Sequence, residues 1–492
     1  MAVTDISPAE SFPRLDFVRV GEVPLGINIE PELERAMSDE GGTLQYWDPD
    51  AQVGTTKGFS REYFQKKFDA TVGILKTVRD DVADEDIQRT QLFIDEIFGV
   101  YDGSRPPYRY GGSSAFVAAS RVQRHGAETD NFAACDYRRE TVGCLPILKY
   151  VDEASAQRVM VGMPPFVLDY YGEDNQGGGG VMIFAPLSLD LIPDSGDKAL
   201  DIGLAVAQET SWFAKERLGV KLMSLAALLP KVTGYGALFE YPGIETTTGH
   251  GGTTWLISEV IEKAIQDGRV DPRRAEKIGV LGVGGIGLAT ADYLLGKNAD
   301  LQIAINDHNP KRQQEVGAML RDKYGAKRVL DIPDVAEILQ YGGVTASAIT
   351  QPIDLRTLNL APGSLEGSVY VDDSQPAAVA AEQVIALGGL HVGVIGSDHS
   401  TSRAVGAQRF NYGGLGPRVE LRDVTTGTIT RPGEAYGCAM EGVAKYYAGD
   451  KKDLIKDAVT GDDVRTAAAE CEAMGFVPAA LQTLYDGETI EV

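Results

Sequence analysis

The stretch KIGVLGVGGIGLATADYLL, residues 277–295, decides the fold of this chain. Residues 277–281 form a short apolar run, which predicts a buried strand. The glycine pattern G-x-G-x-x-G follows at once, and residues 288–295 then place apolar side chains at helical spacing. A lone glycine pattern of this kind is weak evidence, but strand, glycines and helix in this order indicate a dinucleotide-binding Rossmann unit.

The glycines of this pattern have separate physical roles. Gly282 permits the tight turn, Gly284 lets the main chain approach a pyrophosphate, and Gly287 allows close packing of helix on strand. The pyrophosphate would then lie at a helix N-terminus, where unpaired N–H groups and the positive end of the dipole favour an anion. The cofactor-binding residues expected in this loop are Gly282, Gly284, Gly285, Ile286 and Gly287.

An acidic residue follows the second strand of this unit, which we expect at 301–305. Asp307 stands about 20 residues after Gly287, where a carboxylate accepts hydrogen bonds from the adenosine ribose and repels a 2′-phosphate. This position favours NAD. Lys311 and Arg312 follow closely and could reach a 2′-phosphate, so the sequence leaves NADP open.

Strand and helix patterns alternate from the glycine loop to about residue 396, which is typical of a parallel sheet. Further strands are expected at 344–350, 368–371 and 390–395, and ligands of such sheets bind beyond the carboxyl ends of the strands. The predicted fold class is α/β, with a Rossmann-type dinucleotide-binding domain, an α/β substrate domain and an unassigned N-terminal section. The expected domains are an N-terminal section 1–160, the first part of a substrate or catalytic domain 161–255, the Rossmann domain 256–410 and a C-terminal helical segment 411–492.

The overall composition excludes several classes of protein. The net charge of -25 argues against duplex nucleic acid or an anionic membrane surface as the main partner. The 4 cysteines form no CxxC or Cys/His cluster, so neither a disulfide framework nor a metal site is expected. Residues 1–17 lack the pattern of a secretory signal, and no run of about 18 apolar residues predicts a membrane span. We therefore expect a cytoplasmic protein.

Two loops carry a histidine that could relay a proton. The first, Thr246–Thr254, is rich in hydroxyl groups and glycine and contains His250; an interdomain hinge that caps a helix beginning at Trp255 explains it equally well. The second carries Asp398 and His399, for which a surface pair is the simpler interpretation. Both histidines remain catalytic candidates.

Cys438 is the candidate nucleophile. The spacing predicts a helix over 434–448, with Pro432 suited to a first helical position, so that Cys438 lies in an early turn. A helix dipole assists a thiolate there only modestly, and Glu434, one turn back, would oppose ionisation. From spacing alone, a buried structural cysteine explains this position better. A further helix is expected over 462–474.

From about Leu225 to the C-terminus, the chain resembles the cyanobacterial-type long-chain acyl-[acyl-carrier-protein] reductases, which form aldehydes. Several short motifs occur in the family's order, and the most telling aligns Cys438 with the family's nucleophilic cysteine. The matching landmarks are Thr247-Thr248-Gly249 with Thr253, the loop Gly282–Gly287, Tyr370-Val371-Asp372 with Pro376, Gly389-Leu390-His391-Val392, Arg431-Pro432 followed by Cys438-Ala439-Met440-Glu441, and Gly475-Phe476-Val477-Pro478-Ala479-Ala480-Leu481.

The resemblance implies a thioester-reducing mechanism. Cys438 would take the acyl group, a hydride would reduce the resulting enzyme thioester, and an aldehyde would leave. It implies NADPH as the cofactor, whereas Asp307 favours NAD, so we expect NAD(P)H without a choice between the two. The implied substrate is an acyl thioester on a carrier protein or on coenzyme A, and homo-oligomerisation stays open.

Two alternatives to this prediction remain. One is a dehydrogenase of the shikimate or amino-acid type, with direct hydride transfer and catalysts from the loops that carry His250 and His399. The other is a non-catalytic NAD(P)-binding scaffold or sensor. Only the thioester mechanism needs Cys438.

Overall fold

In the computed structural model the chain forms two compact units, residues 1–245 with 411–426 and residues 246–410 with 427–492. The expected Rossmann domain and the later part of the expected C-terminal segment thus belong to one unit. The structure describes residues 27–38, 60–104, 114–119, 146–152, 155–156, 159, 163–171, 180–185, 197–226, 229–349, 352–374, 377–397, 434–448, 458–485 and 488–492.

The first unit contains a five-stranded mixed sheet with strand order β2-β3-β1-β4-β5. Strand β1 pairs in parallel with β3 and β4, while β2 is antiparallel to β3. The strands of this unit are β1 Ser114–Ala119, β2 Phe166–Tyr171, β3 Gly180–Ala185, β4 Leu222–Ala226 and β5 Glu245–Thr247, the last reaching into the second unit. Its helices are α1 Glu30–Ser38, α2 Arg61–Val78, α3 Asp84–Asp102, the 3-10 turn Pro146–Tyr150, α6 Asp197–Trp212 with the π-helical turn Phe213–Arg217, and α7 Leu229–Val232.

The second unit is built on a six-stranded sheet with strand order β11-β10-β9-β6-β7-β8. All neighbouring strands are parallel. Numbered along the chain, this is the order 3-2-1-4-5-6 of a Rossmann fold, so the predicted fold class is confirmed. The strands are β6 Lys277–Leu281, β7 Gln302–Asn306, β8 Val329–Asp331, β9 Val344–Ser347, β10 Val369–Asp372 and β11 Leu390–Gly393.

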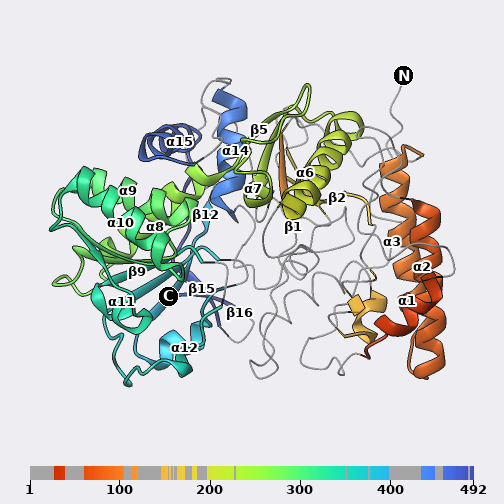
Figure 1. The fold of residues 1–492 in the computed structure, drawn as a ribbon, viewed down its shortest axis with the longest axis horizontal. Helices are drawn as coiled ribbons and strands as arrows, with labels where there is room; N and C mark the ends of the chain where they lie inside the picture. The colour runs from red at the N-terminus through yellow and green to blue at the C-terminus, as the bar shows by residue number, and fades with distance from the viewer. Residues whose placement is uncertain are drawn as a thin grey trace. The chain divides into compact units, whose positions relative to one another are not determined.

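Helices cover both faces of this sheet (Figure 1). Gly279 on β6 lets α11 approach closely, because a Cβ there would lie 2.9 Å from the Ile338 carbonyl oxygen. Leu281 and Tyr370 from the sheet, Ile338 from α11 and Val384 from the helix 381–386 belong to one buried apolar cluster. The helices are α8 His250–Gln266, α9 Gly285–Lys297, α10 Pro310–Tyr324, α11 Val335–Tyr341, the 3-10 turn Leu355–Thr357 and α12 Ala381–Ala386.

The C-terminal segment returns to the Rossmann unit, where α14 and α15 pack against α8. The helix expected from residue 434 begins three residues later, so that prediction is wrong at its start. Glu434 lies instead on a short strand that pairs with Gly396 and Ser397, and Pro432 lies outside the described residues. The elements are β12 Gly396–Ser397, β13 Glu434–Ala435, α14 Gly437–Ala448, α15 Gly461–Ala473, β14 Val477–Pro478, β15 Gln482–Tyr485 and β16 Glu488–Glu491.

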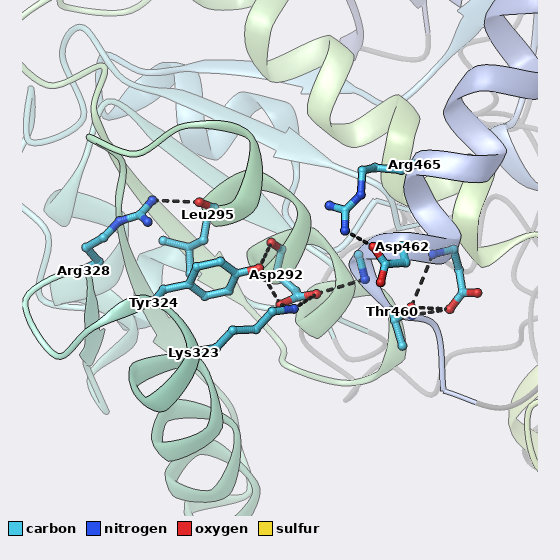
Figure 2. A network of polar contacts seen from close by, with 10 residues as sticks. Asp292, Leu295, Lys323, Tyr324, Arg328, Thr460, Asp462 and Arg465 are labelled. Atoms are coloured by element: carbon cyan, nitrogen blue, oxygen red, sulfur yellow. Dashed lines mark hydrogen bonds and ion pairs between the residues drawn. The ribbon is translucent and has the colours of Figure 1, made fainter.

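Asp292 on α9 joins the Rossmann helices to α15 (Figure 2). Its carboxylate accepts hydrogen bonds from Lys323 Nζ at 2.7 Å and from the Tyr324 hydroxyl at 2.9 Å. The N–H of Gly461, the first residue of α15, donates to the same carboxylate at 2.9 Å. Because Asp292 is only 7% exposed, these three donors replace water, and the carboxylate holds the start of α15 in place.

Replacing Asp292 by alanine should lower the free energy of unfolding of this unit by roughly 2–3 kcal/mol, because buried donors lose their acceptor. Urea denaturation followed by circular dichroism measures this free energy of unfolding. Asp462→Ala is the matched control, since Asp462 pairs with Arg465 on the surface and its side chain is 86% exposed. The control should cost less than about 1 kcal/mol. Equal losses in the two variants would show that Asp292 forms an ordinary surface pair.

Candidate functional site

The glycine loop has the shape that a pyrophosphate needs. Gly282 has a φ of 79°, in the left-handed region, and a Cβ on Gly287 would lie 1.8 Å from the Gly282 carbonyl oxygen. Gly284 caps α9, and a Cβ built on it would meet no atom of the described residues within 4 Å. Gly285 and Ile286 begin the helix and present their N–H groups at its N-terminus. The loop therefore leaves an open cradle at a positive helix end, which fits a dinucleotide pyrophosphate.

Asp307 lies directly after β7 and is bonded to this loop. Its Oδ2 accepts the N–H of Val283 at 2.9 Å, and its Oδ1 accepts the N–H of Asn309 at 2.9 Å. Arg312 Nε donates to the Val283 carbonyl oxygen at 3.1 Å. The neighbouring His308 side chain is 85% exposed. Asp307 thus anchors the glycine loop, and its carboxylate lies beside the place where the ribose of a dinucleotide is expected.

The expected loop 246–254 is wrong in its second half, because α8 begins at His250 rather than near Trp255. Gly249 caps the helix with a φ of 70°, which only glycine adopts without strain. His250 is buried, and burial lowers its pKa to about 4. At neutral pH it is therefore a neutral imidazole in the first turn of α8.

Cys438 lies in the first turn of α14 and is half-buried. Burial, together with the charge of the Asp373 carboxylate, raises the pKa of its thiol to about 12. The Ala439 N–H and the Thr253 hydroxyl bond to the sulfur and offset only part of this rise. The thiol is therefore protonated at neutral pH. The expectation that Glu434 opposes this ionisation from one helical turn back is wrong. Glu434 lies on the short strand β13 instead, and its carboxylate accepts a hydrogen bond from Gln482 Nε2 at 2.8 Å.

Close main-chain packing brings Cys438 to the first turn of α8. A Cβ on Gly437 would lie 2.5 Å from the Gly252 carbonyl oxygen, and a Cβ on Gly252 would lie 2.3 Å from the Gly437 carbonyl oxygen. The two helices can approach this closely only because both residues are glycine. Cys438 directly follows Gly437, and His250 lies two residues before Gly252, so two of the three catalytic candidates lie in adjoining helix turns.

The loop after β10 carries Asp373, the carboxylate that contributes to the raised pKa of Cys438. Asp372, which is 1% exposed, accepts the N–H groups of Ser374 at 2.9 Å and Ala378 at 2.7 Å. His391 on the neighbouring strand places its Nε2 3.6 Å from the Asp372 carboxylate. These two buried residues shape the loop that carries Asp373. The motif residues around Asp372 and His391 are therefore structural supports of the site.

The third catalytic candidate, His399, lies outside the described residues, together with Asp398. The sequence alone assigned no role to Asp373 or Thr253, both of which affect the pKa of Cys438. The signal available for Asp373 was its place after a strand of a parallel sheet.

Within the described residues no group of three or more His, Cys, Asp or Glu side chains could hold a metal ion. No helix in the same part of the chain is long and apolar enough to cross a membrane.

The buried imidazole should make folding stability pH-dependent. Because the folded protein holds the pKa of His250 at about 4, below the ordinary 6.5, only the unfolded chain takes up a proton between these values. The contribution of His250 to the free energy of unfolding is therefore fully present above pH 6.5 and is lost as the pH falls toward 4. Urea denaturation from pH 7 to pH 4 should show a loss of about 3 kcal/mol in wild type that His250→Gln removes. The exposed control His308→Gln should keep the wild-type slope, and a His250→Gln slope equal to wild type would contradict a buried neutral imidazole.

The strand order and the glycine loop define the second unit as a Rossmann-type dinucleotide-binding fold. No protein-family model and no curated protein matches the sequence.

Solved structures resemble the chain only distantly. A glutamate dehydrogenase from Thermus thermophilus is 11% identical, with 75% of each chain covered and a TM-score of 0.31. A quinate dehydrogenase from Corynebacterium glutamicum, solved with NAD, is 14% identical over 57% of this chain and 87% of its own, with a TM-score of 0.27. An imine reductase from Pseudomonas sp. is 18% identical over 24% of this chain, with a TM-score of 0.19, and only 40% of its length is spanned. At such values these likenesses carry no argument about activity.

Proposed function

We propose that this protein is an NAD(P)H-dependent reductase that converts an acyl thioester to an aldehyde, with Cys438 as the acyl acceptor. The observation that supports it is the environment of Cys438, which is half-buried, bonded to the Thr253 hydroxyl and near enough to Asp373, the residue after β10, for that carboxylate to raise the pKa of its thiol. Ligands of a Rossmann sheet bind beyond the carboxyl ends of such strands. The only other described free cysteine, Cys471, is fully buried within α15.

The sulfur of Cys438 attacks the thioester carbonyl carbon; a new C–S bond forms, and the carrier leaves as a thiol with the proton that Cys438 gives up. When bound, the dinucleotide supplies the hydride that reduces the enzyme-bound acyl group. The resulting hemithioacetal oxyanion collapses, its C–S bond breaks, the aldehyde leaves, and the thiolate takes a proton from solvent.

The protonated thiol places a demand on this mechanism. Since its pKa is raised to about 12, the proton must pass to an acceptor as the C–S bond forms. The neutral imidazole of His250 and the carboxylate of Asp373 are the acceptors that the described site offers. The same observation favours a second candidate, a dehydrogenase with direct hydride transfer, in which a protonated thiol and a neutral histidine only line the site.

Intact mass spectrometry after incubation with acyl-coenzyme A and acyl-carrier-protein thioesters, without reductant, separates the two candidates. The covalent mechanism predicts an adduct of the mass of the acyl group, mapped by peptide digestion to Cys438. Absence of an adduct with every thioester, together with turnover of a carbonyl substrate, would replace the proposal by direct transfer. The thioester that gives the adduct also identifies the carrier.

For the cofactor, we propose that NADH binds at least as well as NADPH because Asp307 lies beside the glycine loop. Asp307→Ser should shift the ratio of the two dissociation constants toward NADPH by roughly 1–2 kcal/mol, about the scale of one charged contact. Fluorescence titration with each cofactor measures the ratio. NADH affinity should also fall, because Val283 loses its acceptor. A wild-type preference for NADPH above about tenfold would contradict this and assign the 2′-phosphate to Lys311 and Arg312.

A further inference from the structure

Glu441, one turn after Cys438 on α14, bonds the turn that begins α8. It is 0% exposed, its Oε1 accepts the hydroxyl of Thr247, and its Oε2 accepts the N–H of Gly252 at 2.7 Å. Gly252 is the third residue of α8, and its N–H has no acceptor within that helix. A carboxylate on one helix therefore caps the N-terminus of the other.

The contact between Glu441 and Gly252 lies next to the place where α14 and α8 approach closely through Gly437 and Gly252. Gly252 donates to Glu441 and also meets Gly437, while the next residue, Thr253, bonds to the sulfur of Cys438. A shift of α14 along α8 would break the carboxylate bonds and move Cys438 away from Thr253. The Glu441 carboxylate and the contact between Gly252 and Gly437 together fix the position of α14 along α8.

A partly buried ion pair between Lys445 and Glu470 completes the arrangement. Lys445 lies one turn after Glu441, its side chain is 0% exposed, and its Nζ lies 2.9 Å from Glu470 Oε2 on α15. Burial raises the pKa of Glu441, and the charge of Lys445 opposes that rise. The lysine thus favours the ionised carboxylate, which is the form that accepts two hydrogen bonds.

We propose that Glu441 is a positioning residue, which locks α14 onto the first turn of α8 so that Cys438 is held against Thr253 and partly shielded from water. This role rests on the proposed function in that Cys438 is taken to be the acyl acceptor. The bonds from Thr247 and Gly252 are the means of positioning, and the Lys445–Glu470 pair supports them.

The test changes Thr247 rather than the carboxylate, which avoids a buried charge without any partner. Thr247→Val keeps the shape and removes the hydroxyl donor, whereas Thr247→Ser keeps the hydroxyl. Iodoacetamide labelling of Cys438 is followed from pH 7 to pH 11 by peptide mass mapping. Cys471 in the same unit reports general opening because it is fully buried. Glu262→Gln on α8, which breaks a surface pair with Lys297 on α9, is the matched control.

In Thr247→Val, water should reach the thiol, so its pKa should fall by about one unit and labelling at pH 8 should rise about tenfold. Acyl-adduct formation with acyl-coenzyme A should fall by about tenfold or more. Thr247→Ser should restore both rates to within about threefold of wild type, since the hydroxyl is retained, and Glu262→Gln should match wild type. Cys471 should stay unlabelled throughout.

Two results would overturn the inference: a wild-type labelling profile in Thr247→Val, or equal acceleration at Cys438 and Cys471, which would show general loosening. Failure of the proposed function is seen separately, as absence of an acyl adduct in wild type. The labelling rates test the positioning of Cys438 in that case too.

Discussion

Cys438→Ala is expected to abolish aldehyde formation while leaving dinucleotide affinity within about twofold of wild type. The covalent mechanism has no other acyl acceptor in the described site, and the glycine loop that holds the dinucleotide is unchanged. Cys438→Ser should be nearly as inactive, because a hydroxyl is a weak nucleophile without an adjacent strong base. Steady-state turnover with NADH or NADPH and an acyl thioester, together with a cofactor titration, measures both quantities.

Cys471→Ala is the control for this experiment. Cys471 is fully buried, so its loss should reduce thermal stability and keep most of the turnover. A structural Cys438 would behave in the same way as this control. A Cys438→Ala enzyme that keeps a tenth or more of the wild-type kcat would end the covalent mechanism and favour direct hydride transfer.

The dinucleotide-binding half of the fold could be predicted because its signals are local. Residues 277–295 contain a complete strand, turn and helix, and the alternation that follows fixes a parallel sheet. The structure extends this with the strand order, which depends on pairings such as β6 with β9 across more than 60 residues of chain. No periodicity in a single strand specifies its neighbours.

The start of α14 could not be predicted for a similar reason. Pro432 and the apolar spacing favour a helix from residue 434. Glu434 and Ala435 instead pair with Gly396 and Ser397, so a long-range strand pairing replaces the first helical turn. This places Cys438 in the first turn of the helix, where the sequence had put it one turn further in.

Glu441 shows what a motif alone leaves out. The sequence placed it among the landmarks of a resemblance but gave it no function, since its hydroxyl partner, Thr247, is separated from it by 194 residues. The same holds for Asp373, whose approach to Cys438 depends on the loop that buried Asp372 shapes. Residues that act through such contacts become visible only once the helices and loops are placed.

A matched pair of glycine substitutions should separate ligand binding from packing in the cofactor loop. Gly284→Ala adds a methyl group where, in the described part of the chain, no atom lies within 4 Å, at a φ of -66° that alanine adopts freely. Its melting temperature should therefore stay within about 2 °C of wild type. Its affinity for NADH and NADPH should fall on the order of a hundredfold, about 2.7 kcal/mol, because the methyl group occupies the space of the pyrophosphate.

Gly287→Ala should behave differently, because its Cβ would lie 1.8 Å from the Gly282 carbonyl oxygen. The backbone of α9 must shift away from β6, which should cost about 3 kcal/mol of folding stability in addition to cofactor affinity. Differential scanning fluorimetry with and without cofactor measures both effects. Undiminished NADH and NADPH binding by Gly284→Ala would mean that no pyrophosphate approaches this loop. The Rossmann unit would then serve packing alone, and hydride chemistry would have no place at the carboxyl edge of its sheet.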